Sequence, residues 1–348
     1  MAAGRRLALV ALLLLLVATA GAMAQQPIAT ATKSTLDAVR ERGFLICGST
    51  DPSAGFAQQS DTGQWRGFDV DLCRAIATAV FGDPAKLQFR PLLGDARFAH
   101  LQTGAIDVIS RNASWSMARD TRYRTVFVGP AFFDGQAFMV SETQGVVSAY
   151  ELSRISVCVL DDDQQLAAMR EFFFLNQAQV SEILYEDRED LGVAYRAGLC
   201  QAISAPASVL YAIRRELPTP TQHRILPERI SSEAFGPVVR EGDEQWFSVV
   251  KWTLFTLINA EELGVNASNV DVLASARTRN VRRLLGLDGD FGTPLGLDRQ
   301  FMRNIIAAVG NYGEIFERWF GAGTGSPVLR GQNALWTEGG LLFAPPIR

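Results

Sequence analysis

The stretch GAIDVISRNASWSMARD, residues Gly104–Asp120, joins a short apolar strand to a polar turn and the start of a helix. Asp107–Ile109 has the pattern of a buried strand end, and Ser116, three residues before Arg119, has the position of a helix N-cap. A strand-to-helix turn at the carboxyl end of a parallel strand is where open α/β sheets bind ligands. The stretch therefore predicts an α/β fold with a ligand site at this turn.

Three polar residues of this stretch are candidates for binding an anion. Asn112 and Ser114, together with the backbone N–H groups of the new helix, would point at an anion, and Arg119 can add a two-pronged contact to a carboxylate. The alternative is that Ser116 is only a cap and Arg119 only a solvated helix residue. Spacing alone does not choose between the two interpretations.

The first 24 residues have the composition of a secretory signal peptide. Arg5 and Arg6 precede an apolar run from Leu7 to Val17, and small residues lead to an expected cleavage site after Ala24. No cysteine follows that site, so we expect an exported protein that is not lipid-anchored.

The overall composition narrows the classes of function. The chain of 348 residues has a formal net charge of −4, which becomes −6 when the two signal-peptide arginines are removed. An acidic exported chain is a poor candidate for binding nucleic acid, and its length suits two domains. The two histidines, His100 and His223, lie far apart without metal-ligand spacing, so we expect neither a metal nor a cofactor.

Four cysteines are present, which is an even number in a chain expected to reach an oxidising compartment. They allow three pairings, among which the sequence does not choose. We expect the pairs Cys47–Cys73 and Cys158–Cys200, because each would lie within one domain; each would contribute about 3 to 4 kcal/mol in the chain-entropy model. Four buried free thiols are the alternative.

The alternation of strand and helix patterns predicts two similar α/β lobes. We expect lobe one to comprise residues 34–141, lobe two residues 142–237, and lobe one again residues 238–348. The apolar strand ISVCVL, Ile155–Leu160, begins the second β-α-β series, and a long helix covers Asp243–Leu263. Two extended crossovers between the lobes would form a hinge with a cleft.

Two aromatic and two acidic residues lie before and at the start of the second helix expected in lobe one. Phe56 and Trp65 lie in a turn-rich segment, and we expect Phe56 to be an exposed ligand platform and Trp65 a packing residue. Asp69 and Asp71 flank a helix start, where carboxylates are favoured by the helix dipole, so we expect both to cap it.

Segments along nearly the whole mature chain resemble the general L-amino-acid-binding periplasmic proteins of ABC importers, the longer branch of solute-binding protein family 3. The four cysteines are included in the resemblance. The segments are GFDVDLCRAIATAVFGD (67–83), RFAHLQTGAIDVISRNASWSMARD (97–120), DGQAFMV (134–140), FGPVVREGD (235–243), WTLFTLINAEELGVNASNVD (252–271), GNYGEIFERWFG (310–321) and GGLLFAPPIR (339–348).

The resemblance implies the two-lobed periplasmic-binding-protein fold of type II. Each hinged lobe would have a central mixed sheet, and a C-terminal extension would lie on lobe one. The lobes would close on a polar amino acid in the periplasm and deliver it to ABC permease subunits in the inner membrane, without catalysis. Two alternatives stay open: a dehydratase- or lyase-like enzyme on this scaffold, and a sensory binding protein.

The resemblance also implies roles for individual residues. Arg119 matches the arginine that grips the ligand's α-carboxylate, and Ser114 and Asn112 match positions that bind its carboxylate and amine. In lobe two, Gln164 stands where such proteins have the second threonine of a Gly-Thr-Thr run. Pro206 stands where they have an aspartate that holds the ammonium.

The missing threonine and aspartate imply a site that has drifted from general amino-acid binding. Asp161, Asp162 and Asp163 precede Gln164, and if Asp163 and its neighbours faced the cleft they would favour a cation. If instead these acids cap the following helix, the site is merely reshaped. We expect ordinary amino acids to bind weakly and a basic or otherwise modified ligand to be preferred.

Overall fold

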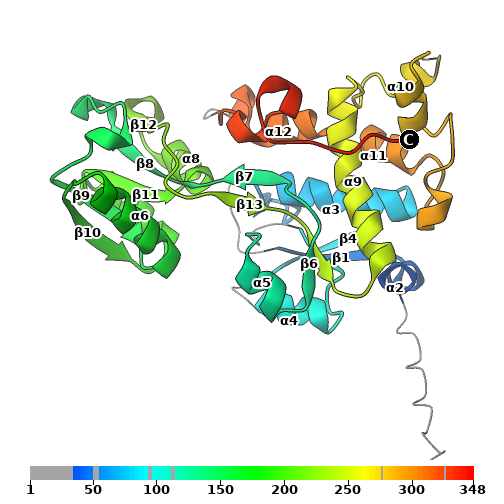
Figure 1. Cartoon of the computed structure of the whole chain (residues 1–348), viewed down its shortest axis with the longest axis horizontal. Coiled ribbons are helices and arrows are strands. Elements are labelled where there is room, and N and C mark those ends of the chain that lie inside the picture. Colours follow the sequence, from blue (N-terminus) through cyan, green and yellow to red (C-terminus); the bar gives the residue numbers. More distant parts are fainter. Residues whose placement is uncertain (1–33, 50–54, 93–95, 111–113, 276, 325–326) are drawn as a thin grey trace, which may run out of the picture. The chain divides into compact units, whose positions relative to one another are not determined.

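The computed structural model describes residues 34–49, 55–92, 96–110, 114–275, 277–324 and 327–348 (Figure 1). The expected signal peptide, residues 1–24, lies outside these ranges. Residues Thr35–Arg348 form one compact unit. Across the described ranges, no helix combines the length and the apolar character needed to cross a membrane.

Lobe one is built on a mixed sheet of five strands in the order β4-β1-β5-β14-β6. Strand β1, between β4 and β5, is buried along its whole length and runs parallel to both, while β14 runs antiparallel to β5 and β6. The strands are β1 (Leu45–Ser49), β4 (Leu87–Pro91), β5 (Val108–Ile109), β6 (Thr125–Phe127) and β14 (Val238–Arg240), with a small hairpin of β2 (Gln58–Gln59) and β3 (Trp65–Arg66) beside them.

The helices of lobe one come from both ends of the chain. Helix α3 packs against α9 and α11, and buried side chains of these helices and of α12 form one core with those of β1. The C-terminal extension therefore lies on lobe one, as expected (Figure 1). The helices are α2 (Thr35–Arg42), α3 (Phe68–Phe81), α4 (Ala96–Gln102), α5 (Met117–Arg122), α9 (Glu244–Glu262), α10 (Arg279–Leu284), α11 (Phe301–Val309) and α12 (Tyr312–Phe320).

Lobe two has a second mixed sheet, in the order β10-β9-β11-β8-β12. Strands β9, β10 and β11 are parallel, and β8 runs antiparallel to β11 and β12. The elements are β8 (Gln136–Ser141), β9 (Ile155–Leu160), β10 (Val180–Tyr185), β11 (Ala202–Pro206), β12 (His223–Ile225), α6 (Asp163–Leu175), α7 (Arg188–Arg196) and α8 (Ala207–Glu216).

The expected lobe boundary between residues 141 and 142 would assign strand β8 to lobe one, but β8 lies in lobe two. Because β8 pairs with β11 on one side and β12 on the other, it belongs to the second sheet. The chain passes between the two sheets through β7 (Phe132–Asp134) and β13 (Glu233–Phe235), which pair with each other. These are the two extended crossovers that the sequence predicts.

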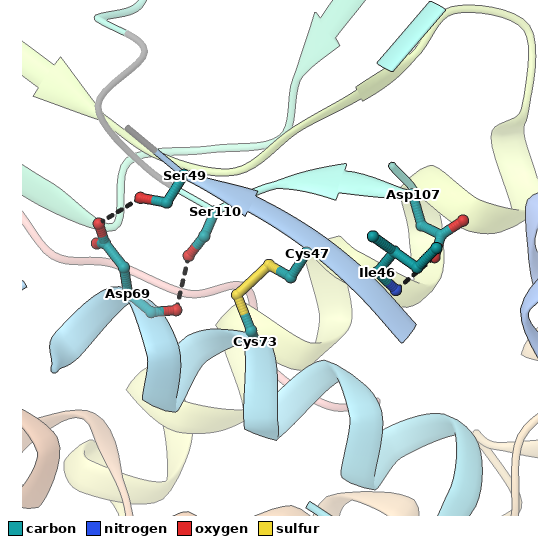
Figure 2. The surroundings of a disulfide bond; sticks show 7 residues. All are labelled: Ile46, Cys47, Ser49, Asp69, Cys73, Asp107 and Ser110. Carbon is teal, nitrogen blue, oxygen red and sulfur yellow. Dashed lines mark hydrogen bonds between the residues drawn. A yellow bond between two sulfur atoms is a disulfide. The ribbon is translucent and has the colours of Figure 1, made fainter. Parts of the chain in front are cut away.

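Both predicted disulfides form, and each lies within one lobe. Cys47–Cys73 joins β1 to α3, as Figure 2 shows, and Cys158–Cys200 joins β9 to the residues before β11. No free cysteine is present among the described residues. Neither bridge restrains one lobe against the other.

The expectation that Asp69 and Asp71 cap α3 is wrong, because the N-cap is Gly67 and no side chain bonds there. Asp69 instead accepts a hydrogen bond from Ser49 at 3.1 Å (Figure 2), and Asp71 accepts one from Trp319 of α12 at 2.7 Å. Both carboxylates are buried. They connect α3 to the end of β1 and to the C-terminal extension.

Candidate functional site

A pocket of about 890 Å³ is lined by residues of both lobes. Lobe one contributes residues of α4 and α5 and of the turn before α5, and lobe two contributes the amino end of α6 and the ends of β8 and β11. Four residues that lead back to lobe one line the remaining wall: Ser231, Ser232, Glu233 and Phe235. The volume lies in the upper part of the range of about 300–1,000 Å³ that is usual for small-molecule sites.

The turn before α5 fixes the side chain of Arg119. Ser116 is the N-cap of α5, as predicted, and accepts a hydrogen bond from the Arg119 N–H. The Arg119 guanidinium donates to the carbonyl of Ser114 at 2.9 Å and lies 5.8 Å from the ring centroid of Phe98. No ion pair joins Arg119 to a described residue, so its charge is available to a ligand in the pocket.

The same turn is attached to the crossover strand β13. Ser114 forms a β-bridge with Phe235, and the N–H of Trp115 donates to the carbonyl of Ala234 at 2.9 Å. Ser114 and Arg119 therefore both line the pocket, and the ligand contacts that the resemblance implies for them stay a prediction. Asn112, the third residue expected at this turn, lies outside the described residues.

The acidic run of lobe two caps a helix. Asp162 is the N-cap of α6 and accepts hydrogen bonds from the N–H groups of Gln164 and Gln165, at 3.1 and 2.9 Å. Gln164 lines the pocket. Asp163 is the exposed first residue of α6 and is not among the lining residues. The capping interpretation of this run is therefore the better one for Asp162.

Positive charge predominates in the pocket. Among the described residues that line it are four arginines, Arg97, Arg119, Arg122 and Arg188, and two acids, Asp162 and Glu233. Arginine stays protonated in proteins, and the Asp162 carboxylate already accepts two hydrogen bonds from the end of α6. This balance favours an anionic ligand and does not support the expectation of a basic one.

The expectation that Phe56 is an exposed ligand platform is wrong. Its side chain is 0% exposed and packs in the lobe-one core, with its ring centroid 5.0 Å from that of Phe132 and 4.7 Å from that of Phe320. Trp65 packs against Phe89 at 5.1 Å, as expected. Phe56 is buried because α12, far along the chain, covers it.

Trp115 is the aromatic residue that sequence reasoning missed. Its indole is 55% exposed, stacks on Phe127 with centroids 4.9 Å apart, and donates to Asp120 at 2.8 Å. It lines the pocket between Ser114 and Ser116. Its place within the polar turn was the available signal, because an aromatic residue there has no apolar strand or helix pattern to join.

Metal binding has no candidate site in the described parts of the chain. No group of three or more histidine, cysteine, aspartate or glutamate side chains is arranged there to hold an ion. The described pocket lining contains serine, arginine, glutamine and two acids as its main polar side chains, and these are groups that bind by hydrogen bonds and charge.

Comparison with known proteins identifies the family. Residues 45–265 match the model of the bacterial extracellular solute-binding proteins, family 3. The general L-amino acid-binding periplasmic protein AapJ of Rhizobium johnstonii is 43% identical over 91% of this chain and 94% of its own. The glutamate/glutamine/aspartate/asparagine-binding protein BztA of Rhodobacter capsulatus is 43% identical over 94% of this chain and 97% of its own.

A solved structure agrees with the fold. The ABC transporter periplasmic binding protein from Brucella ovis with glutathione bound is 43% identical, superposes with a TM-score of 0.83, and covers 91% of this chain and 100% of its own. The expected two-lobed fold of type II is thereby confirmed, and so is the resemblance on which it rested. The chain belongs to family 3 of the bacterial extracellular solute-binding proteins.

Proposed function

We propose that the protein is the periplasmic solute-binding component of an ABC importer and that it captures an acidic amino acid or a short acidic peptide between its lobes. The proposal includes export, delivery of the ligand to permease subunits in the inner membrane, and no catalysis. Family membership supports the transport role, and the pocket supports the ligand class.

The excess of arginine in the pocket carries the proposal. A single α-carboxylate would engage Arg119, and a second anionic group of the ligand would meet the further positive charge of Arg122, an exposed arginine of the same helix that also lines the pocket. Each charge-assisted hydrogen bond between a guanidinium and an anionic group stabilises the complex, so a ligand with a second anionic group binds better. L-glutamate and glutathione each have two carboxylates and one amino group. The relative BztA is named for glutamate among its ligands, and the Brucella relative has glutathione bound.

Binding rather than chemistry suits the polar side chains available. Among the described lining residues there is no histidine, lysine or cysteine that would activate a serine or act as a nucleophile. Asp162, one of the two acids in the described lining, already uses its carboxylate to accept hydrogen bonds from the start of α6. We therefore favour a binding protein over the enzyme on the same scaffold.

A thermal-shift screen tests the proposal. The purified protein is heated with L-glutamate, glutathione, L-leucine or L-arginine, and a ligand present at 100 times its dissociation constant stabilises by about 2.7 kcal/mol. We expect L-glutamate or glutathione to raise the melting temperature most. A larger shift with L-arginine or L-leucine, or no shift with either acidic ligand, would overturn the ligand class.

A further inference from the structure

We propose that Gln136 determines specificity for the ligand's amino group, by accepting a hydrogen bond from it at the side-chain carbonyl oxygen, Oε1. Gln136 is the first residue of β8, is 2% exposed, and lines the pocket. Its Oε1 is buried and has no hydrogen-bond partner among the described residues. The inference rests on the proposed function and specifies how lobe two recognises the ligand.

The orientation of the Gln136 amide follows from its neighbour Ser204. The hydroxyl of Ser204 donates its single proton to the carbonyl of Ala137 at 3.1 Å. The hydroxyl oxygen must therefore accept from Gln136, and the atom 2.9 Å away is the amide nitrogen Nε2. With Nε2 held by Ser204, the atom left without a partner among the described residues is Oε1, which is an acceptor.

The backbone holds Gln136 firmly in place. Its N–H donates to the hydroxyl of Ser231 at 2.9 Å, and its carbonyl accepts from the N–H of Ile230 at 2.8 Å. Across the sheet it lies opposite Pro206. Gln136 therefore adjoins the position where relatives are expected to have an aspartate for the ammonium, and where this chain has a side chain that cannot accept a hydrogen bond.

A buried carbonyl oxygen selects for a hydrogen-bond donor. An ammonium or amide N–H satisfies Oε1, whereas a carboxylate oxygen or a methylene leaves it unpaired in a desolvated site. Gln165, in the first turn of α6, also lines the pocket, and its Oε1 is likewise buried without a partner among the described residues. The arginines thus suit the carboxylates, and Gln136 and Gln165 suit the N–H groups.

Calorimetric titration with matched probes tests the assignment. L-glutamate is paired with glutarate, which lacks only the amino group, and glutathione is paired with its deaminated analogue. Of L-glutamate and glutathione, the one that binds the unaltered protein more tightly is chosen. This ligand and its analogue without the amino group are then titrated into Gln136→Met, which keeps the side-chain length but removes the amide. We expect the amine-bearing ligand to bind about 10-fold more weakly and the analogue to change by less than about 2-fold.

Gln136→Glu decides the matter if the methionine variant does not fold. A carboxylate oxygen attracts an ammonium more strongly than an amide oxygen does. For Gln136→Glu, we expect the ratio of the analogue's dissociation constant to that of the amine-bearing ligand to be at least about 3-fold higher than for the unaltered protein.

Several outcomes would overturn the assignment while leaving the proposed function intact. One is an equal loss of both probes in Gln136→Met, which would make Gln136 a structural residue. Another is an unaltered protein that binds the amine-bearing ligand and its analogue equally well. A third, where Gln136→Glu decides, is a preference that does not rise. If the unaltered protein binds neither pair, the proposed function fails and the assignment of Gln136 fails with it.

Discussion

Replacing Arg119 by alanine should abolish tight binding without unfolding the protein. The guanidinium is half-buried, donates to the Ser114 carbonyl and lies near the ring of Phe98, but it has no ion pair with a described residue. Its loss removes one hydrogen bond to a carbonyl and leaves no buried carboxylate unpaired. We therefore expect the free energy of unfolding of the unliganded protein to fall by less than about 1 kcal/mol.

The effect on affinity should be far larger. Two unit charges about 4 Å apart in surroundings with an effective dielectric constant of about 20 attract by about 4 kcal/mol, and desolvation of the guanidinium and the carboxylate reduces that gain. Truncating one member of a desolvated, hydrogen-bonded charge pair costs about 2 to 4 kcal/mol. The dissociation constant for L-glutamate or glutathione should therefore rise about 30- to 1,000-fold.

Isothermal titration calorimetry measures the dissociation constant, and urea titration of the unliganded protein measures its stability. Arg196→Ala is the matched control, because Arg196 is an exposed arginine of α7 outside the pocket and its loss changes the net charge equally. That variant should bind like the unaltered protein. An Arg119→Ala protein that binds within about 3-fold of the unaltered one, or that is unfolded, would refute the reasoning.

Three further predictions concern stability. Phe56→Ala should lower the free energy of unfolding in urea by about 3 to 5 kcal/mol and leave the dissociation constant unchanged. Weaker binding without a loss of stability would show that Phe56 contacts the ligand. Replacing Cys158 and Cys200 together by alanine removes a bridge with a sequence separation of 42 and should lower the free energy of unfolding by up to about 4 kcal/mol. A loss under about 1 kcal/mol would show that the bridge does not stabilise the fold. Burial would raise the pKa of Asp243, but hydrogen bonds from Thr35 and from the start of α9 lower it below its ordinary value. Its stabilising effect should therefore be present above the unfolded-state pKa and be lost as the pH falls through the folded-state pKa. Urea unfolding should show a smaller advantage over Asp243→Asn at about pH 3 than at about pH 6, and a pH-independent difference would contradict this.

Local patterns predicted the turn at the site well. Ser116 caps α5 because a side-chain oxygen three residues before a free N–H suffices for a cap, and no distant part of the chain has to be known. The strand Ile155–Leu160 was predicted with the same bounds for a similar reason, since its apolar run is continuous. The cysteine pairs followed from their positions within the predicted lobes.

Features that depend on distant contacts were not predictable. Phe56 is buried by Phe320, which is far away in the sequence, so its own turn-rich surroundings suggested exposure instead. Strand β8 was assigned to lobe one because pairing with β11 is a matter of sheet order and leaves no local signal. The same pairing brings Gln136 beside Pro206, and Arg188 reaches the pocket from another helix, so neither was identified from the sequence.

A crystal structure with the most strongly stabilising ligand of the panel tests the central claim most directly. We expect the ligand between the lobes, with one carboxylate within hydrogen-bond distance of the Arg119 guanidinium and a second anionic group beside Arg97, Arg122 or Arg188. A ligand bound elsewhere, or one in this pocket whose carboxylate does not contact Arg119, would contradict the account.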